Sequence, residues 1–258
     1  MLALAAPRYA PAAIPRGGAM PVHLRYPNFL PDQRQFFDEL ITEDWDAYQS
    51  ADWDAVRRFE VARLFQLVRP RRVLDVGCGC GFHDVAMASY PFVDLVHGID
   101  YSPNSIARAN DVYPHVKVSR TVADFASWIP PERYGLVASF HVIEHLEKPD
   151  ELMAFCRDAC ADDGHVAVFT PNRARLRNVL RRLRGQAALL CDPQHFREYS
   201  RHEIERLGSR HGLVSVGAFG YGMTGVGWLD RATVGRRLAT GHRLSRLADA
   251  LCVVMRRR

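Results

Sequence analysis

Apolar residues between positions 32 and 69 recur at the spacing of a helix rather than a strand. They form one stripe across 36–41 and a second across 61–68, where positions i, i+3, i+4 and i+7 are apolar. Proline lacks the backbone donor that a helix interior requires, so the second helix is expected to end before Pro70. We therefore predict a cap of two helices over residues 32–69.

After residue 70 the pattern changes to short apolar runs that alternate with amphipathic helical segments. Strands that alternate with helices form βαβ units, in which the strands are parallel and helices cover both faces of the sheet. The last two runs suit an antiparallel hairpin. The sequence thus predicts an α/β fold with a doubly wound, seven-stranded sheet, mainly parallel with an antiparallel last strand. The expected strands are 73–77, 95–100, 116–122, 135–140, 165–170, 213–220 and 251–255.

The first 31 residues differ from the rest of the chain because they are rich in Ala and Pro and lack periodicity. Pro7, Arg8 and Pro11 interrupt the apolar stretch that a secretory signal needs, so 1–31 is interpreted as a flexible tail. Residues 32–258 are expected to form one domain, since 48% hydrophobic residues suffice for a single large core. Within it, 221–250 is interpreted as an insertion before the last strand.

The net charge of +5 is unevenly distributed, because arginines gather in short segments. Residues 171–184 hold six arginines and no acid, and residues 231–258 hold eight arginines against one aspartate. The rest of the chain is net acidic, so a nucleic-acid partner is not expected. The arginines of 173–184 suit an anionic acceptor as well as a solvated helix face, and the basic C-terminal region suits peripheral membrane contact.

The same composition disfavours a membrane-spanning protein and a fold built around a metal ion. No run approaches the roughly 18 consecutive apolar residues that a membrane-spanning helix needs. The six cysteines include no C-x-x-C pair, so a zinc ribbon is not expected. Sparse cysteines are typical of proteins in a reducing compartment, and we expect a cytoplasmic protein.

Candidate chemistry begins in the turn after the first strand, which reads DVGCGCG over 75–81. Its alternate glycines let the backbone turn tightly and approach a ligand where a Cβ would collide. Asp100 closes the second strand, where a carboxylate can accept both hydroxyls of a ribose. Asp124 follows the third strand, although a solvated turn is an equally simple explanation for it alone. Together these strand ends predict a crevice of adenosine size.

Two cofactor classes fit such a crevice, and the loop discriminates between them. A dinucleotide site reads G-x-G-x-x-G, whereas Gly81 comes one position early and gives G-x-G-x-G. Asp75 would repel a pyrophosphate but suits the amino group of an amino-acid moiety. The loop therefore favours S-adenosylmethionine over NAD.

These motifs and those that follow them resemble the motifs of class I S-adenosylmethionine-dependent methyltransferases, in order and spacing. The segments are VLDVGCGCG, GIDYS, VADF, YGLVASFHVIEHLEKPDELM and DGHVAVFTPN, within residues 52–220. The resemblance implies a Rossmann-like sheet with S-adenosylmethionine as methyl donor. Within the superfamily, VIEHL is similar to the branch of ubiquinone-biosynthesis O-methyltransferases and many small-molecule or glycan methyltransferases.

The resemblance also implies a role for each cofactor-binding residue. The methionine moiety is expected to lie against Asp75, Gly77, Cys78, Gly79 and Gly81. The ribose is expected at Asp100, with Tyr101 packed near the adenine. The adenine N6 is expected at Asp124 with Phe125 alongside, and the sulfonium end beside Phe140 and His141.

The candidate catalytic residues are His141, His145 and His195. His141, Glu144 and His145 fall at i, i+3 and i+4, so on a helical turn they would share a face. Three interpretations stay open: residues that fix the loop, a general base for a hydroxyl acceptor, or ligands of a divalent metal. Some quinone O-methyltransferases carry an E-x-x-E-H metal cluster here, and His141 departs from it, so no metal is predicted.

Among these residues, His141 is interpreted as the better base candidate, because it comes first after the strand, and His145 as structural support. His195, in DPQHFREYSRHE, resembles an acceptor-side histidine of the family, with a hydrogen-bonded loop histidine as the alternative. The sequence therefore predicts methyl transfer from S-adenosylmethionine to a small-molecule or glycan acceptor, at oxygen in preference to other atoms. An RNA methyltransferase that uses the arginine cluster, and a protein that binds S-adenosylmethionine without turnover, are the alternatives.

Overall fold

Seven strands form one sheet in the computed structural model, which describes residues 33–43, 51–222 and 243–258. The strands are β1 (Arg72–Val76), β2 (Leu95–Asp100), β3 (Val118–Val122), β4 (Tyr134–Phe140), β5 (Cys160–Pro171), β6 (Leu213–Tyr221) and β7 (Ala250–Arg257). Their order is β3-β2-β1-β4-β5-β7-β6, with β7 antiparallel to both of its neighbours and the other pairs parallel. The predicted doubly wound, mainly parallel sheet is confirmed, and its strand order reverses between β1 and β4.

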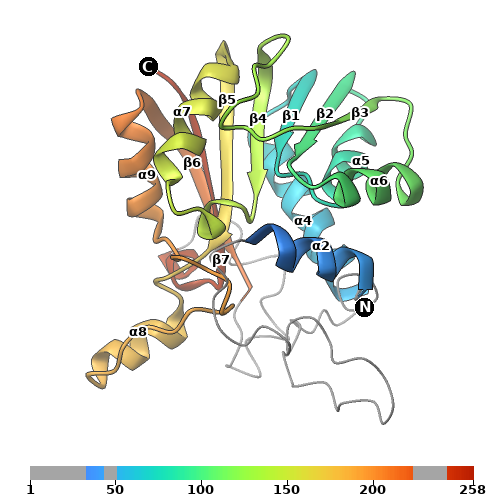
Figure 1. The fold of residues 1–258 in the computed structure, drawn as a ribbon. Helices are drawn as coiled ribbons and strands as arrows, with labels where there is room; N and C mark the ends of the chain where they lie inside the picture. The colour runs from blue at the N-terminus through green and yellow to red at the C-terminus, as the bar shows by residue number, and fades with distance from the viewer. Residues whose placement is uncertain (1–32, 44–50, 223–242) are drawn as a thin grey trace, which may run out of the picture.

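Helices cover both faces of this sheet (Figure 1). They are α2 (Gln33–Glu43), α4 (Ala51–Leu67), α5 (Phe82–Ala88), α6 (Pro103–Val112), α7 (Pro149–Ala159), α8 (Leu176–Leu183) and α9 (Arg201–Arg210), with short 3-10 turns η1 (Ile143–His145) and η3 (Arg243–Leu247). Side chains alternate along a strand, so in β1 Val73 packs with α4 and α5 while Leu74 packs with α7 and α9. None of the described helices is long and apolar enough to cross a bilayer.

Local sequence signals place the ends of several helices. Ser102 caps α6 by accepting a hydrogen bond from the Ser105 backbone, and Pro103 occupies the first helical position. Ser200 and Glu203 form a capping box at the start of α9. In both helices, side chains at the start satisfy backbone N–H groups that have no partner within the helix, which explains where each helix begins.

The start of β5 differs from the sequence prediction, which began this strand at 165. In the structure α7 ends at Ala159 and β5 begins at Cys160. The added residues form an irregular extension whose pairing with β4 shifts between Tyr134 and Leu136. A Cβ on Gly164 would lie 2.9 Å from the Tyr134 carbonyl oxygen, so the irregular pairing requires a glycine at this position.

The two N-terminal helices take different positions. Helix α4 packs against one face of the sheet beside α5. Helix α2 lies across the edge where the parallel strands end (Figure 1), since Asp38 accepts a hydrogen bond from the Ser102 hydroxyl after β2 and Phe37 contacts His145 after β4. The predicted tail lies outside the described residues, as does 223–242, most of the predicted insertion between β6 and β7.

Candidate functional site

The glycine loop lies between β1 and α5, at the point where the strand order reverses. Gly77 and Gly81 have φ values of +75° and +76°, which side-chain-bearing residues rarely adopt. A Cβ on Gly77 would also lie 2.5 Å from Val142, and one on Gly81 2.6 Å from Arg120. The loop therefore has glycines where backbone conformation and close packing both require them, and ligands of open α/β sheets bind at this edge.

Asp100 joins the glycine loop to the end of β2. One carboxylate oxygen accepts the Gly79 backbone N–H at 2.9 Å, and the other accepts the Ser102 backbone N–H at 2.9 Å. Burial raises the pKa of this carboxyl group, and the two backbone donors oppose the shift. Each oxygen keeps a lone pair, so the geometry leaves Asp100 able to accept hydroxyl donors from a ligand.

A group of buried carboxylates underlies the loop. Asp75 is fully buried, and neither of its oxygens has a hydrogen-bond partner. Asp84, at the start of α5, pairs with Arg120 at 2.7 Å. Burial raises the pKa of Asp75 well above its usual value, and the negative charges of Asp84 and Asp100 add to the effect. Asp75, Asp84 and Asp100 thus bring three carboxylates together around the single guanidinium of Arg120, which favours a cationic ligand.

Sequence analysis missed Asp84 and Arg120, although one signal was available. A Cβ on Gly98, in the middle of β2, would lie 2.7 Å from Asp84 Oδ2. A glycine inside a predicted strand indicates the close approach of another group. Here that group is the carboxylate of Asp84.

The predicted adenine-side residues are arranged less tightly. Asp124 is exposed. Its side chain accepts the backbone N–H of Ala126, two residues later, at 3.0 Å, so it forms a local turn of the kind that aspartate favours. The half-buried Phe125 packs against Phe155 of α7. The Arg34 guanidinium lies over the ring of Tyr101, 4.9 Å from its centroid.

Phe140, the last residue of β4, lies inside the core rather than on an open surface. Its ring stacks between those of His83, at 3.8 Å between centroids, and Phe169, at 4.4 Å. Only 6% of the residue is exposed. A ligand beside it would therefore meet the ring edge and the backbone.

His141 follows β4 with a φ of +57°, a left-handed conformation that is uncommon for a residue with a side chain. Its Nε2 lies 3.0 Å from Glu60 Oε1 and 3.1 Å from the Tyr221 hydroxyl, and its Nδ1 lies 3.4 Å from Glu144 Oε1. Burial opposes a positive charge, but contact with Glu144 and Glu60 raises the pKa of His141 to about 10. At neutral pH the ring is therefore an imidazolium with a carboxylate on each side.

Glu60, the carboxylate that contacts His141, is a further residue of the site that sequence analysis missed. It extends from α4, is 1% exposed, and also accepts hydrogen bonds from His83 Nε2 at 2.8 Å and from the Tyr221 hydroxyl. Burial disfavours its charge, but His141 and His83 hold the pKa of Glu60 below its usual range. The available signal was a carboxylate one residue before Val61 and four before Leu64, on the apolar stripe of the predicted helix.

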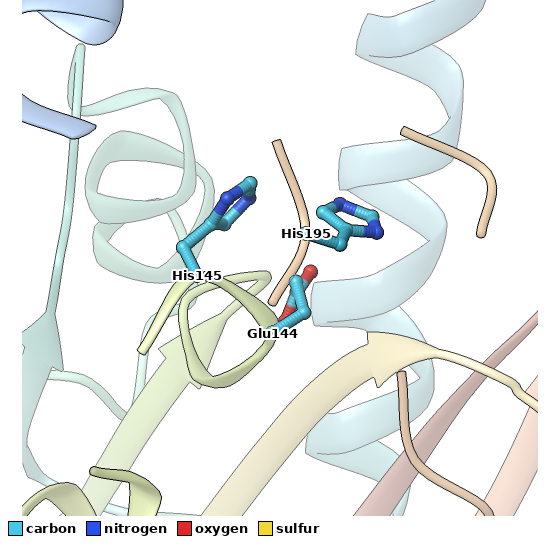
Figure 2. Close-up of side chains that lie close together, drawn as sticks. All are labelled: Glu144, His145 and His195. Carbon is cyan, nitrogen blue, oxygen red and sulfur yellow. The ribbon is translucent and has the colours of Figure 1, made fainter. Parts of the chain in front are cut away.

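The three predicted histidines lie around the carboxylate of Glu144. Glu144 and His145 belong to η1 after β4, whereas His195 lies on the segment that leads to α9 (Figure 2). The candidate ligand atoms of Glu144, His145 and His195 all lie within 4.8 Å of one another, and both Glu144 oxygens are buried, with the His141 ring 3.4 Å from Oε1. Burial opposes the charge of Glu144, but His141 lowers its pKa. The arrangement could hold a divalent cation or, equally, stay balanced by the histidines.

His145 and His195 are held by different partners. His145 Nδ1 lies 3.1 Å from the Gln194 carbonyl oxygen, which can only accept, so Nδ1 carries the proton. Burial lowers the pKa of His145, so its Nε2 keeps a free lone pair at neutral pH. His195 Nδ1 lies 3.3 Å from Glu198 Oε1, and Glu198 also pairs with the buried Arg175.

The predicted arginine cluster is divided by the structure. Arg173 pairs with Glu203 at 2.8 Å, and Arg175 is 6% exposed and pairs with Glu198. Both guanidinium groups are engaged by carboxylates of the protein itself, Arg175 inside the fold and Arg173 at a half-exposed position. The remaining four arginines of the cluster lie on or directly after α8.

Comparison with known proteins shows which family and which folds this chain is similar to. A family model described as a methyltransferase domain matches residues 49–216. The ubiquinone biosynthesis O-methyltransferase of Yersinia pestis (strain Pestoides F) is 28% identical over 148 residues, which are 53% of this chain and 59% of that protein. The chain thus matches less than two thirds of the length of this curated relative.

Solved structures share the fold at low sequence identity. An N-methyltransferase from Bradyrhizobium japonicum WM9, in complex with S-adenosyl-L-homocysteine, has a TM-score of 0.58 and 16% identity over 87% of this chain and 98% of its own. Magnesium protoporphyrin IX methyltransferase from Synechocystis PCC 6803, with the same ligand bound, has a TM-score of 0.59 and 16% identity over 88% and 100%. At this identity the likeness concerns the fold.

Proposed function

Because this chain belongs to the methyltransferase-domain family and has the fold of class I S-adenosylmethionine-dependent methyltransferases, we propose that it transfers a methyl group from S-adenosylmethionine to an oxygen of a small-molecule or glycan acceptor. The curated relative is named for O-methylation in ubiquinone biosynthesis, and one structural neighbour for N-methylation. The choice of oxygen therefore rests on the geometry of the histidines described below.

The observation that carries the cofactor assignment is the excess of buried carboxylates at the glycine loop. S-adenosylmethionine brings an α-ammonium and a sulfonium, both cationic, whereas NAD brings a pyrophosphate. We assign Asp75, whose two oxygens lack donors, to the ammonium, directly or through water. We assign Asp100 to the ribose hydroxyls, which its remaining lone pairs could accept. A pyrophosphate at the same loop would meet three carboxylates and one arginine, Arg120.

Methyl transfer to a hydroxyl needs alignment, exclusion of water and removal of one proton. The sulfonium is a good leaving group, so alignment of the acceptor oxygen with the methyl carbon is the main requirement. His141 does not suit the role of base given to it from the sequence, because an imidazolium has no lone pair to accept a proton. We assign it instead to hydrogen-bond donation and to fixing the loop between Glu60 and Glu144.

His145 is the better base candidate. Its proton is fixed on Nδ1 by the Gln194 carbonyl group, and its Nε2 is free to accept a proton from an acceptor hydroxyl. His195 lies beside it, with 4.8 Å between ring centroids, and is assigned to the acceptor side. This assignment exchanges the roles that the sequence suggested for His141 and His145.

The RNA alternative is weakened because Arg173 and Arg175, two of the six arginines on which it depended, are already paired with Glu203 and Glu198. A non-catalytic protein would bind S-adenosylmethionine and transfer nothing, which an activity measurement distinguishes.

The experiment incubates the protein with S-adenosylmethionine that carries an isotopically labelled methyl group, together with fractionated small-molecule extracts. Mass spectrometry should find a labelled product, and a general base of this kind contributes roughly 10²–10⁴-fold, so His145→Gln should reduce its formation by a factor in that range. His202→Gln, on the exposed side of α9, is the matched control and should leave turnover unchanged. Unchanged turnover in His145→Gln would refute the base assignment, and no labelled product in any fraction would contradict the proposed activity.

A further inference from the structure

Helix α8 and the segment after it form a projection that departs from the layers of the fold (Figure 1). Residues 171–191 contain six arginines and no acid. Residues 182–190 are all exposed, including Leu183, Leu189 and Leu190. The segment thus combines positive charge with exposed apolar surface.

The side of α8 that is fixed to the protein is polar. Asn178 is fully buried, its amide group donates to the carbonyl oxygens of Leu189 and Arg173, and its oxygen accepts the Leu189 backbone N–H at 3.0 Å. Arg175, immediately before the helix, is buried beside Glu198. These contacts fix the orientation of the helix about its own axis.

The apolar side of α8 therefore faces away from this anchor. Residues in a helix turn by about 100° each, so Leu180 and Leu183 lie on the opposite side from Asn178. Their exposed fractions are 41% and 79%. An amphipathic helix of a globular domain normally packs its leucines against the core. In α8 the polar side packs against the protein instead.

Arginines accompany this leucine face. On the same helical projection, Arg177 and Arg184 lie beside the leucines, whereas the exposed Arg182 lies nearer to the side of Asn178. Within the described part of the chain these three guanidinium groups pair with no carboxylate, and Arg181 donates to the Ala187 carbonyl oxygen at 2.8 Å. The positive groups are free to meet an external anionic surface.

We propose that α8 is an interfacial helix that binds the surface of an anionic lipid bilayer. Helices of this kind insert leucines at the level of the acyl chains and place arginines among the phosphates of the headgroups. A bilayer uses both properties of α8, whereas a nucleic acid would use the arginines and leave the leucines in water. This assignment places membrane contact on α8 rather than on the basic C-terminal region, and it is independent of the proposed methyl transfer.

The test is flotation of the full-length protein with vesicles of phosphatidylcholine alone or of equimolar phosphatidylcholine and phosphatidylglycerol. The protein should float with the anionic vesicles only, and added salt should weaken the association because surface charges are screened. Arg177→Gln/Arg182→Gln/Arg184→Gln should lower the partition coefficient roughly a hundredfold. Leu180→Ser/Leu183→Ser should lower it by roughly tenfold or more, with the charge unchanged.

Arg206→Gln/Arg256→Gln/Arg258→Gln is the charge-matched control, because it removes three arginines outside α8 and includes two from the C-terminal end. It should float like the wild type. All variants should keep the wild-type melting temperature, since the substituted side chains are exposed.

Three results would overturn the proposal. The first is wild-type protein that does not float with anionic vesicles, or α8 variants that float as well as the wild type. The second is binding of single-stranded RNA by the wild type and the leucine variant but not by the arginine variant, together with the absence of flotation. This result would assign the arginines to RNA. The third is self-association in sedimentation that the leucine variant abolishes, again without flotation, which would assign the leucines to a second copy of the chain.

Discussion

Replacing Glu60 with glutamine should change the protonation of His141 in a measurable way. In the wild type the imidazole lies 3.0 Å from Glu60 Oε1 and 3.4 Å from Glu144 Oε1, and its pKa is about 10. An opposite charge at this distance shifts a pKa by about 1–3 units. Glu60→Gln keeps the size of the side chain and removes its charge, while Glu144 remains. The pKa of His141 should therefore fall to roughly 7–9 rather than to the value of a free histidine.

The assay is an NMR titration of the histidine ring protons, with the His141 signal assigned by its loss in His141→Gln. Glu147→Gln is the control, because this exposed carboxylate lies in the same loop and pairs with no cation in the described residues. It should leave the pKa of His141 unchanged. A wild-type pKa near that of a free histidine would refute the assignment of His141 as an imidazolium, and so would an equal value in the wild type and Glu60→Gln.

The same contact predicts how stability depends on pH. A raised folded-state pKa stabilises the protein fully below the unfolded value, about 6.5 for histidine, and the contribution is lost as the pH rises through the folded value, about 10. Between these limits the free energy of unfolding should fall more steeply in the wild type than in His141→Gln, by up to about 1.4 kcal/mol per pH unit. Denaturant unfolding at a series of pH values measures the difference. Parallel profiles would contradict it.

The remaining predictions concern the loop, the ion pairs and the metal question. Binding of S-adenosylmethionine should release a proton from the raised-pKa carboxyl of Asp75, so its apparent enthalpy should vary with the ionisation enthalpy of the buffer; an enthalpy that does not vary would count against this contact. Arg175→Gln should lower the free energy of unfolding by about 3–5 kcal/mol, because Glu198 stays buried without its partner. Arg173→Gln, at a half-exposed pair, should cost less than about 1 kcal/mol, and similar losses in both variants would be inconsistent with these assignments. Methyl transfer should survive treatment with a chelator; loss of activity that added magnesium or zinc restores would instead assign a metal to Glu144, His145 and His195.

The fold was accessible from the sequence because its signals are local. Alternating strands and helices predict a parallel sheet, and Ser102 and Ser200 carry their capping signals within a few residues of the groups that they bind. The start of β5 was misplaced because Asp163 and Gly164 have the composition of a helix end. Their role in the irregular pairing with β4 depends on Tyr134, a residue distant in the sequence.

The candidate site was accessible only where its residues follow strand ends. Gly77, Asp100 and His141 could be predicted in this way, because parallel strands end at one edge of the sheet. Glu60 and Arg120 come from a helix and from the middle of a strand, so no motif indicated that they approach the site. The protonation of His141 could not be predicted for the same reason, since one of the two carboxylates that determine it is Glu60.

Calorimetric titration with S-adenosylmethionine, S-adenosylhomocysteine and NAD tests the central claim most directly. The wild type should bind the first two and not NAD. Asp100→Ala should weaken binding by about tenfold or more, because a hydrogen bond to a charged group is worth roughly 1.5–3 kcal/mol, while Asp163→Ala, at an exposed carboxylate outside the site, should have no effect. Tighter binding of NAD than of S-adenosylmethionine, or an unchanged affinity in Asp100→Ala, would contradict the assignment of this loop as a site for S-adenosylmethionine.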